Sequence, residues 1–215
     1  MSLTLYLHPL SSFCHKVLIA LYEGSIPFEP RIVNLGDPAD RDAFSKVWLP
    51  AKFPVIQDSA RGQTIPESTT IIEYLDLHYP GRIRLVPADA ELARQTRLTD
   101  RFFDLYVHLP MQKVVGDKLR PAGKNDPYGV ELAKAQLQTA FGMINQEMAT
   151  KTWAMGDAFS MADCAAAPAL FYANLVLPFG DAHKNMAGYF GRLMERPSFA
   201  RAVEEAKPYF ALFPK

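Results

Sequence analysis

The sequence is poor in cysteine and carries no excess of charge of either sign. Its 215 residues contain two cysteines, Cys14 and Cys164, which are too few for a disulfide scaffold and favour a reducing, cytoplasmic setting. Lysine plus arginine number 23, as do aspartate plus glutamate, so the net charge is zero. Because a nucleic-acid binder needs a basic surface to displace counterions, the balanced charge argues against that class of protein.

Long apolar runs, metal-ligand clusters and phosphate-binding loops are also missing. No stretch approaches the uninterrupted apolar length that spans a bilayer, and residues 1–10 lack the basic start and apolar run of a signal peptide. The five histidines do not cluster with cysteines or acids, and no glycine-rich phosphate loop is present. We therefore expect no membrane span, no metal site and no nucleotide site.

The first 80 residues alternate between strand-like and helix-like segments. Alternating β-favouring residues predict a strand at 3–7, and a serine N-cap at Ser11 or Ser12 predicts a helix that Gly24 ends. Further strands are predicted at 28–33, 53–57 and 64–65, and further helices at 43–49 and 67–79. This order predicts an α/β fold with a mixed sheet of about four strands.

The rest of the chain shows helical periodicity and no convincing strand. Pro80-Gly81 breaks the first pattern, and residues 82–87 are typical of a linker. We therefore expect two domains, 1–80 and 88–215, the second all-helical. One helical stripe consists of Leu92, Leu98, Phe102, Leu105 and Leu109, and Pro110 is expected to end or kink that helix. Later helices are predicted at 161–177, 184–195 and 198–206, the first opened by a capping box at Ser160 and Asp163.

Residues Ser11 to Cys14 lie where the first strand meets the first helix. A helix N-terminus presents free amides and partial positive charge, which stabilise an anion such as a thiolate. The spacing is that of a C-x-x-C redox motif whose first cysteine is replaced by serine, so dithiol chemistry is lost and a hydroxyl donor remains. The structural alternative is that either serine is merely an N-cap and Cys14 a buried apolar residue.

Two further motifs could bind a peptide-like ligand. Pro54 opens an apolar strand, which suits a cis Phe53-Pro54 bond that turns the Phe53 backbone outward; an ordinary trans proline at a strand end is the alternative. Glu67 and Ser68 begin a helix, where the acid could meet an ammonium and the serine a carboxylate. Plain helix capping would also explain both residues.

Together these motifs resemble the glutathione transferase superfamily, in its cytosolic, bacterial type. The resemblance covers nearly the whole chain. It rests on Ser11-Ser12-Phe13-Cys14, Lys52-Phe53-Pro54-Val55, Glu67-Ser68, and the segments 72–75, 156–163 and 191–197. It implies a thioredoxin-like first domain with a mixed four-stranded sheet, an all-helical second domain and a homodimer in which the first domain contacts the partner's long helices.

The resemblance also implies a site for glutathione as co-substrate. Ser11 matches the catalytic serine of the theta and zeta classes, with Ser12 as its rival if the loop is shifted by one residue. Phe53 would pair with glutathione through its backbone, Pro54 would shape that loop, Glu67 and Ser68 would hold the γ-glutamyl end, and Lys52 would approach the tripeptide. The second substrate, a small hydrophobic electrophile, is expected between the domains, against Leu10, Phe103, Tyr106 and Phe210.

Departures from the family pattern keep alternatives open. The tyrosine that ends the first strand in the alpha, mu and pi classes is replaced by Leu7, and strand alternation directs Tyr6 to the other face. Phe53 replaces the commoner valine, and Leu49 stands where asparagine is usual. The functions that the resemblance implies are a detoxifying transferase, a zeta-like isomerase or a non-catalytic glutathione-binding or protein-interaction module.

Overall fold

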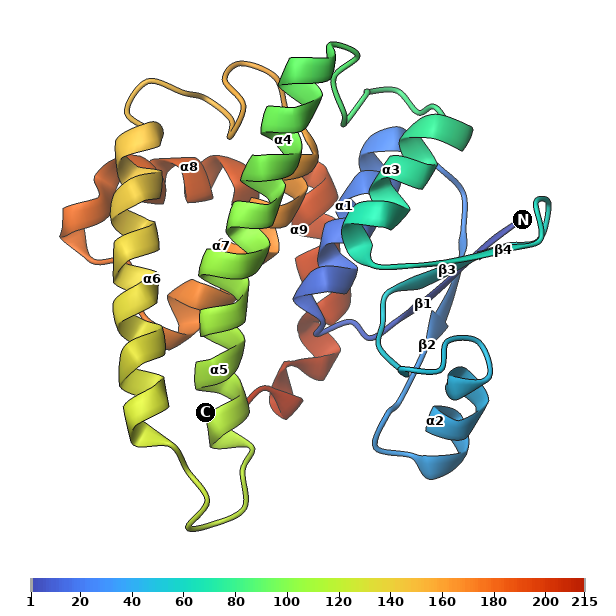
Figure 1. Cartoon of the computed structure of the whole chain (residues 1–215), viewed down its shortest axis with the longest axis horizontal. Helices are drawn as coiled ribbons and strands as arrows, with labels where there is room; N and C mark the ends of the chain where they lie inside the picture. The colour runs from blue at the N-terminus through green and yellow to red at the C-terminus, as the bar shows by residue number, and fades with distance from the viewer. Residues whose placement is uncertain (1, 215) are drawn as a thin grey trace.

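A four-stranded mixed sheet forms one end of the protein, which is described here by a computed structural model covering residues 2–214 (Figure 1). The strands are β1 (Leu3–Leu7), β2 (Glu29–Ile32), β3 (Val55–Asp58) and β4 (Gln63–Pro66), in the spatial order β2-β1-β3-β4. β1 is parallel to β2, whereas β3 is antiparallel to both of its neighbours. The mixed sheet predicted from the sequence is confirmed, and each strand lies within two residues of its predicted position.

Helices cover both faces of this sheet. α1 (Ser12–Gly24) and α3 (Ser68–His78) share one core with the inward residues of β1, and α2 (Pro38–Ser45) lies on the opposite face. Tyr6 points to the α2 side, where its ring stacks on Phe44 at 5.5 Å between centroids. The predicted orientation of Tyr6, away from the α1 side, is therefore confirmed.

The position predicted for the second helix was wrong. Residues 43–49 were expected to be helical, but α2 spans Pro38–Ser45 and Leu49 lies after it, 85% exposed. The start signal was present in the sequence, because the Asp37 side chain accepts a hydrogen bond from the Ala39 amide and Pro38 occupies the first turn. The apolar residues that follow α2 instead form part of a loop.

From residue 90 onward the described chain is helical, as predicted. Residues 79–89 contain neither helix nor strand, and the division into domains 1–80 and 88–215 stays a prediction. The helices are α4 (Ala90–Phe102), α5 (Leu109–Lys118), α6 (Pro127–Glu147), α7 (Met161–Val176), α8 (Lys184–Glu195) and α9 (Pro197–Ala206), with short 3-10 turns at Asp181–His183 and Lys207–Leu212. None of the helices within residues 2–214 is long and apolar enough to cross a membrane.

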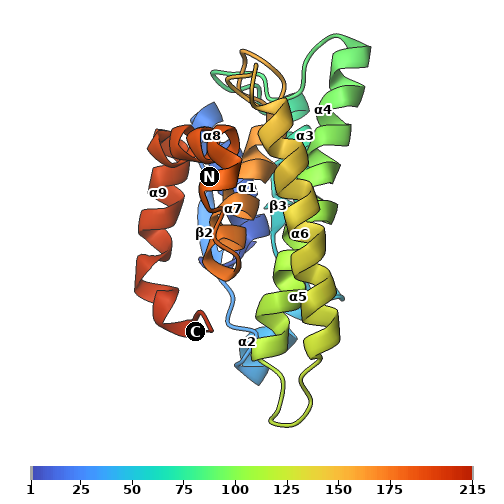
Figure 2. The same cartoon turned by 90° about the vertical axis from the view of Figure 1, so that its left-hand side faces the viewer.

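α7 is the central helix of this arrangement. The predicted capping box begins it: Asp163 accepts hydrogen bonds from the amide and hydroxyl of Ser160. Buried residues of α7 and α1 belong to one continuous core that joins the sheet to the helical part. Figures 1 and 2 show α4, α5 and α6 as two long columns on one side of α7, in front of it in Figure 1, whereas α9 lies on its other side in Figure 2. The two parts are thus packed against each other through α1, α4 and α7.

A π-helical segment, Phe103–His108, joins α4 to α5. The helix does not end at Pro110, which sits in the first turn of α5, where its missing amide hydrogen is tolerated. Four of the five residues of the predicted stripe, all leucines, are exposed rather than buried. Asp100, Asp104 and His108 face inward in their place, at successive spacings of four residues.

Candidate active site

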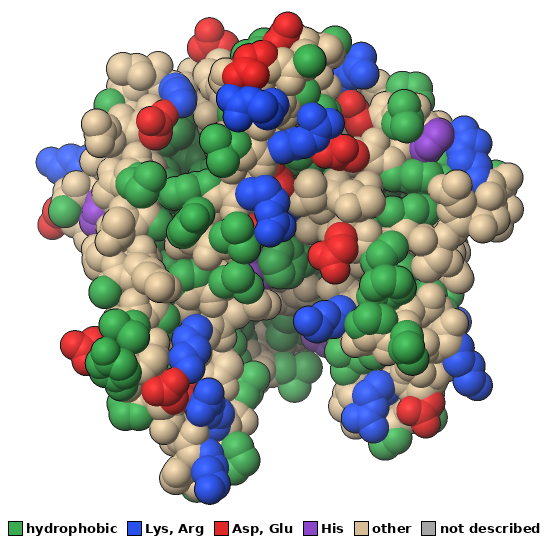
Figure 3. Space-filling view, in the orientation of Figure 1, with side chains coloured by type: hydrophobic (Ala, Val, Ile, Leu, Met, Phe, Trp, Pro, Cys, Tyr) green, Lys and Arg blue, Asp and Glu red, His purple; other side chains and the backbone are tan. Residues whose placement is uncertain are grey.

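Three motifs that are far apart in the sequence converge on one groove. It is a cavity of about 380 Å³ at the N-terminus of α1. The predicted residues that line it are Ser11, Lys52, Phe53, Pro54, Glu67 and Ser68. Leu109 and Gln112 of α5 close it from the helical part. In Figure 3 the molecule is hollowed at the lower edge, between the ends that carry α5 and α2. Only Ser12, among the residues predicted to bind glutathione, is not part of this lining.

The two adjacent serines have different surroundings. Ser11 is the N-cap of α1, is half-buried, and its Oγ accepts a hydrogen bond from the Cys14 amide at 3.3 Å. Ser12 is 6% exposed, and its Oγ shares a hydrogen bond of 3.1 Å with Nε2 of His108. Burial lowers the pKa of His108 to about 3, so its imidazole is neutral at pH 7. Ser12 is therefore tied to the helical part, whereas Ser11 faces the groove.

Cys14 is a buried structural residue. Its side chain is fully buried, and burial raises the pKa of the thiol to about 12. The thiol therefore stays protonated near pH 7 despite its place in the first turn of a helix. Cys164 is also fully buried, and burial raises the pKa of its thiol. Any thiolate chemistry at this helix terminus must use a thiol that a ligand brings.

The loop before β3 presents unpaired backbone to the groove. The Phe53-Pro54 bond is cis, one of the two forms considered from the sequence. Within the described residues, the amide and carbonyl of Phe53 make no hydrogen bond to the rest of the chain. Ala51, two residues earlier, has a φ of 50°, an uncommon value for a residue with a side chain. The loop can thus pair with an extended peptide-like ligand.

Glu67 occupies a strained backbone position at the start of α3. Its φ is 68°, and such non-glycine conformations cost about 1–3 kcal/mol and cluster at ligand sites. Its side chain makes no capping hydrogen bond to the helix. Ser68, the first residue of α3, is 5% exposed and lines the same groove. The helix N-terminus and the acid together suit a ligand carrying both a carboxylate and an ammonium.

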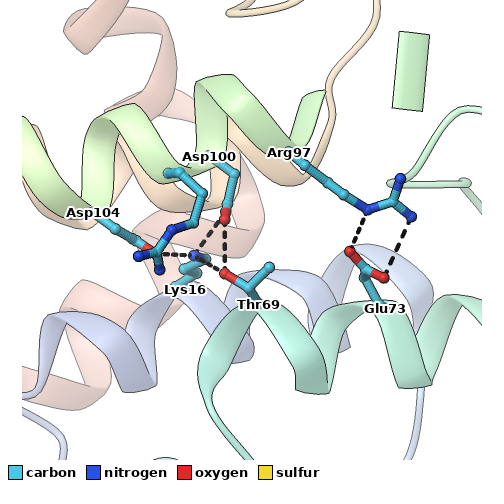
Figure 4. A network of polar contacts seen from close by, with 7 residues as sticks. Lys16, Thr69, Glu73, Arg97, Asp100 and Asp104 are labelled. Atoms are coloured by element: carbon cyan, nitrogen blue, oxygen red, sulfur yellow. Dashed lines mark hydrogen bonds and ion pairs between the residues drawn. The ribbon is translucent and has the colours of Figure 1, made fainter. Parts of the chain in front are cut away.

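A buried ion-pair network holds α3 in place against α1 and α4 (Figure 4). The ammonium of Lys16, 1% exposed, lies 2.7 Å from Oδ1 of Asp100 and 2.9 Å from Oδ2 of Asp104. It also donates to the Thr69 hydroxyl, which in turn donates to Asp100. Because Thr69 directly follows Ser68, the network fixes the end of the groove that Ser68 occupies. This network was not predicted from the sequence, although the four-residue spacing of Asp100 and Asp104 was a signal of it.

A second, more apolar pocket adjoins the groove. Its volume is about 380 Å³, and Leu10, Ser11 and Ser12 form one side of it. The opposite wall comes from α5 and from the C-terminal segment. The apolar residues of that wall include Met111, Val115, Leu119, Leu212 and Phe213. The prediction that Leu10 borders a second pocket agrees with this placement.

The other three residues predicted for this pocket lie elsewhere. Phe103 and Tyr106 line a different hollow, between α4, the π segment and α6, and Phe210 packs edge-on against Phe171 at 5.9 Å. The π segment sets which way this helix faces, and it turns Tyr106 to solvent, 58% exposed. The helical residues that line the second pocket come later in the chain and include Met111, Gln112 and Val115 of α5.

The chain matches two families of protein domains. Residues 5–82 match the glutathione S-transferase N-terminal domain, and residues 127–192 match the corresponding C-terminal domain. Among curated proteins, glutathione S-transferase GstB of Escherichia coli is 22% identical over 87% of this chain and 91% of its own. A stringent starvation protein A homologue of Haemophilus ducreyi is 27% identical over 91% of this chain and 87% of its own.

Solved structures agree with these matches. A glutathione S-transferase of Methylobacillus flagellatus, determined with glutathione bound, is 25% identical and superposes with a TM-score of 0.86, covering 94% of this chain and 98% of its own. Poplar glutathione transferase F1, 21% identical with a TM-score of 0.85, has the same fold and covers 97% and 99% of the two chains. With both domain families matched in order, this chain belongs to the glutathione S-transferase superfamily.

Proposed function

We propose that this protein is a glutathione transferase in which Ser11 activates the thiol of bound glutathione. The observation that carries the proposal is the position of Ser11, at the N-terminus of α1 and in the lining of the groove. In the proposed pose the Phe53 backbone pairs with the cysteinyl residue, while Glu67 and Ser68 hold the γ-glutamyl end. Lys52 approaches the tripeptide from the same loop.

The interactions that Ser11 and the N-terminus of α1 can make are strong enough to lower the pKa of a bound thiol. A free thiol has a pKa of about 8.5, and lowering it by two pKa units requires about 2.7 kcal/mol. A hydrogen bond to a charged group contributes about 1.5–3 kcal/mol, and a helix N-terminus adds about 0.3–1 kcal/mol. Ser11 supplies the first and α1 the second, so the thiolate would form near neutral pH.

The proposed second substrate is a small hydrophobic electrophile. The pocket beside Ser11 has apolar walls from Leu10, Met111, Val115 and Leu119, which suit an apolar molecule of limited size. The thiolate sulfur would attack the electrophilic carbon with its lone pair and form the S–C bond. In a substitution the leaving group departs with its bonding pair; in an addition the π pair shifts to the neighbouring atom, which then takes a proton from water. Binding both reactants side by side raises their effective concentration at the reacting atoms.

Calorimetric titration of glutathione at pH 7, in two buffers of different ionisation enthalpy, tests the proposal. The buffer dependence counts released protons, and we expect release of most of one proton per glutathione bound. Ser11→Ala should still bind glutathione but release little, whereas Ser45→Ala, a half-buried serine of α2 outside both cavities, should behave as the wild type. Absence of glutathione binding, or full proton release by Ser11→Ala, would contradict this role of Ser11.

Two alternatives are distinguished by the same variants. A zeta-like isomerase uses two adjacent serines, but here the Ser12 hydroxyl is engaged with His108, which favours the transferase. A non-catalytic binding module is suggested by the relatives named stringent starvation protein A homologues. Glutathione binding without proton release or turnover in the wild type would favour that module.

We also propose a homodimer formed through the exposed apolar face of α4, the π segment and α6. Leu98 and Tyr106 are 62% and 58% exposed, and they border a hollow of about 420 Å³. Figure 3 shows apolar side chains gathered on this face. Leu49 and Leu77 of the sheet part are also exposed and would meet it from the partner. Sedimentation should give a dimer for the wild type and a monomer for Leu98→Glu with unchanged fold.

The proposed cellular setting is the reducing cytoplasm, with detoxification of electrophiles as the role. Both cysteines are free and buried, so neither needs an oxidising compartment to support the fold. Assaying thiol-dependent turnover in extracts of cells that overproduce or lack the protein tests the role. Equal thiol-dependent turnover of electrophiles in extracts of the two cell types would argue against detoxification.

A further inference from the structure

Ser11 ends a tight turn that joins β1 to α1. The turn consists of His8, Pro9, Leu10 and Ser11. The Ser11 amide closes it by donating a hydrogen bond to the His8 carbonyl at 2.9 Å. Pro9 takes the second position, which its fixed φ favours, and the φ of Leu10 is not positive, which fits a type I turn and excludes type II. The two types differ by a flip of the central peptide, here Pro9–Leu10, so the orientation of that peptide sets how the chain enters Ser11.

Histidine side chains hold both ends of this central peptide. Its carbonyl, which belongs to Pro9, lies 2.6 Å from Nε2 of His15. Because a carbonyl can only accept a hydrogen bond, Nε2 carries the proton and donates it. The amide of the same peptide, which belongs to Leu10, donates to Nδ1 of His8 at 3.2 Å. Pro9 is buried, so its carbonyl would lose free energy without a partner. The two contacts together oppose a flip of the peptide.

The helical part of the protein holds the ring of His15 in place. The ring is fully buried, and its centroid lies 5.8 Å from that of Tyr172 on α7 and 6.2 Å from that of Phe199 on α9. Burial lowers the pKa of His15 to about 4, so at pH 7 the imidazole is neutral and has a single proton, the one donated to Pro9. Within residues 2–214, Nδ1 has no hydrogen-bond partner. The polar contact that this side chain makes is therefore the one with the turn before Ser11.

Building on the proposed function, we propose that His15 is a positioning residue for thiol activation, which acts through Pro9 to keep the Ser11 hydroxyl directed at the glutathione sulfur. Ser11 Oγ accepts a hydrogen bond from the Cys14 amide, which leaves the hydroxyl proton for the thiolate. The strength of that bond depends on its distance and direction, so a turn that rotates away from the sulfur weakens it. The contact proposed for the γ-glutamyl end remains, because Glu67 lies at the start of a different helix, α3.

The test compares His15→Leu with His15→Gln. Leucine removes the donor, whereas the amide nitrogen of glutamine can take the place of Nε2 and donate to Pro9. The readout is the pKa of the thiol of bound glutathione, followed by the ultraviolet absorbance of the thiolate. For His15→Leu this pKa should rise by about one unit, which leaves about tenfold less thiolate, and about tenfold lower kcat/KM, at a pH below it. His15→Gln should restore the wild-type pKa. At pH 5, where glutathione binds as the thiol, the Kd of all three proteins should agree within about twofold.

Val17→Ala is the matched control for lost core packing. Val17 is a buried residue of α1 without a hydrogen-bonding side chain, so this variant should lose stability in urea and keep the wild-type thiol pKa. Nitrogen NMR of the wild type gives a second readout and should show the proton of His15 on Nε2.

The assignment has several ways to fail. It would be overturned by a proton on Nδ1, by an unchanged thiol pKa in His15→Leu, by an equal rise in Val17→Ala, or by no recovery in His15→Gln. Wild-type protein that shows the Nε2 proton but does not ionise glutathione would overturn the proposed function, and this role of His15 with it, while leaving the contact with Pro9 in place. The two failures are therefore distinguishable.

Discussion

The groove and the second pocket are built in different ways, although they share an edge. The groove is positioned by backbone: the start of α1, the loop before β3 and the start of α3, all within the first 80 residues. The second pocket faces Leu10, Ser11 and Ser12 with a wall of side chains from α5 and from residues 212–214, which lie far apart in the sequence. Backbone groups of the loop suit a ligand with a peptide backbone, whereas the fit of the second pocket depends on its side chains.

The most damaging change to the groove should be Lys16→Met. It removes the cation between Asp100 and Asp104 and leaves two buried carboxylates that repel each other. Breaking such a pair costs about 3–5 kcal/mol of unfolding free energy, measured by urea denaturation. Adding Asp100→Asn and Asp104→Asn to that variant should restore much of the stability. If Lys16→Met alone is as stable as the wild type, the network does not support the groove.

Ser11→Ala should lower turnover strongly while changing the structure only slightly. We expect kcat to fall about 10²- to 10³-fold, the usual effect of losing one donor to a developing anion. The lost N-cap should cost about 1 kcal/mol of unfolding free energy. Ser12→Ala is the matched control: it breaks the hydrogen bond with His108 but should retain turnover within a few-fold. Reversal of the two results would make Ser12 the activating serine.

Glu67→Gln should weaken glutathione binding without changing the second pocket. The loss of a charge-assisted hydrogen bond to the γ-glutamyl ammonium predicts a Kd for glutathione about tenfold higher, measured by calorimetry. The KM for the electrophile should not change, because Glu67 lines only the groove of the two cavities. An equal rise in both constants would mean that the cavities are not separable.

Leu119→Ala should give the smallest effect, confined to the second pocket. Leu119 is 67% exposed, so trimming it removes about 1 kcal/mol of apolar contact, or fivefold in kcat/KM for a bulky electrophile. The glutathione Kd should stay constant. Leu132→Ala, an exposed leucine of α6 outside both cavities, is the control. A change in glutathione affinity would contradict the division drawn between the two cavities.

The groove was predictable from the sequence because local rules specify it. Ser11, the Phe53-Pro54 loop and Glu67-Ser68 are each a start signal or a turn, and their roles depend on neighbours within a few residues. Which residues line the second pocket depends on which face of the long column of α4 and α5 is turned toward α1. Phe103 and Tyr106 were predicted for this pocket without a pattern that fixes that face, because a regular 3.6-residue repeat does not include the wider turn at Phe103–His108.

That wider turn works as a change of register within a single helical column. A π segment is equivalent to one inserted residue, and one residue rotates everything after it by about 100° around the axis. Before the insertion the column offers leucines to solvent and aspartates to Lys16; after it, Gln112 and Leu119 line the second pocket. Removing a single residue there would turn this wall of the pocket away while leaving the first half of the column in place. The direction that the side chains of α5 face can therefore change without a change in α4, through the insertion or removal of a single residue.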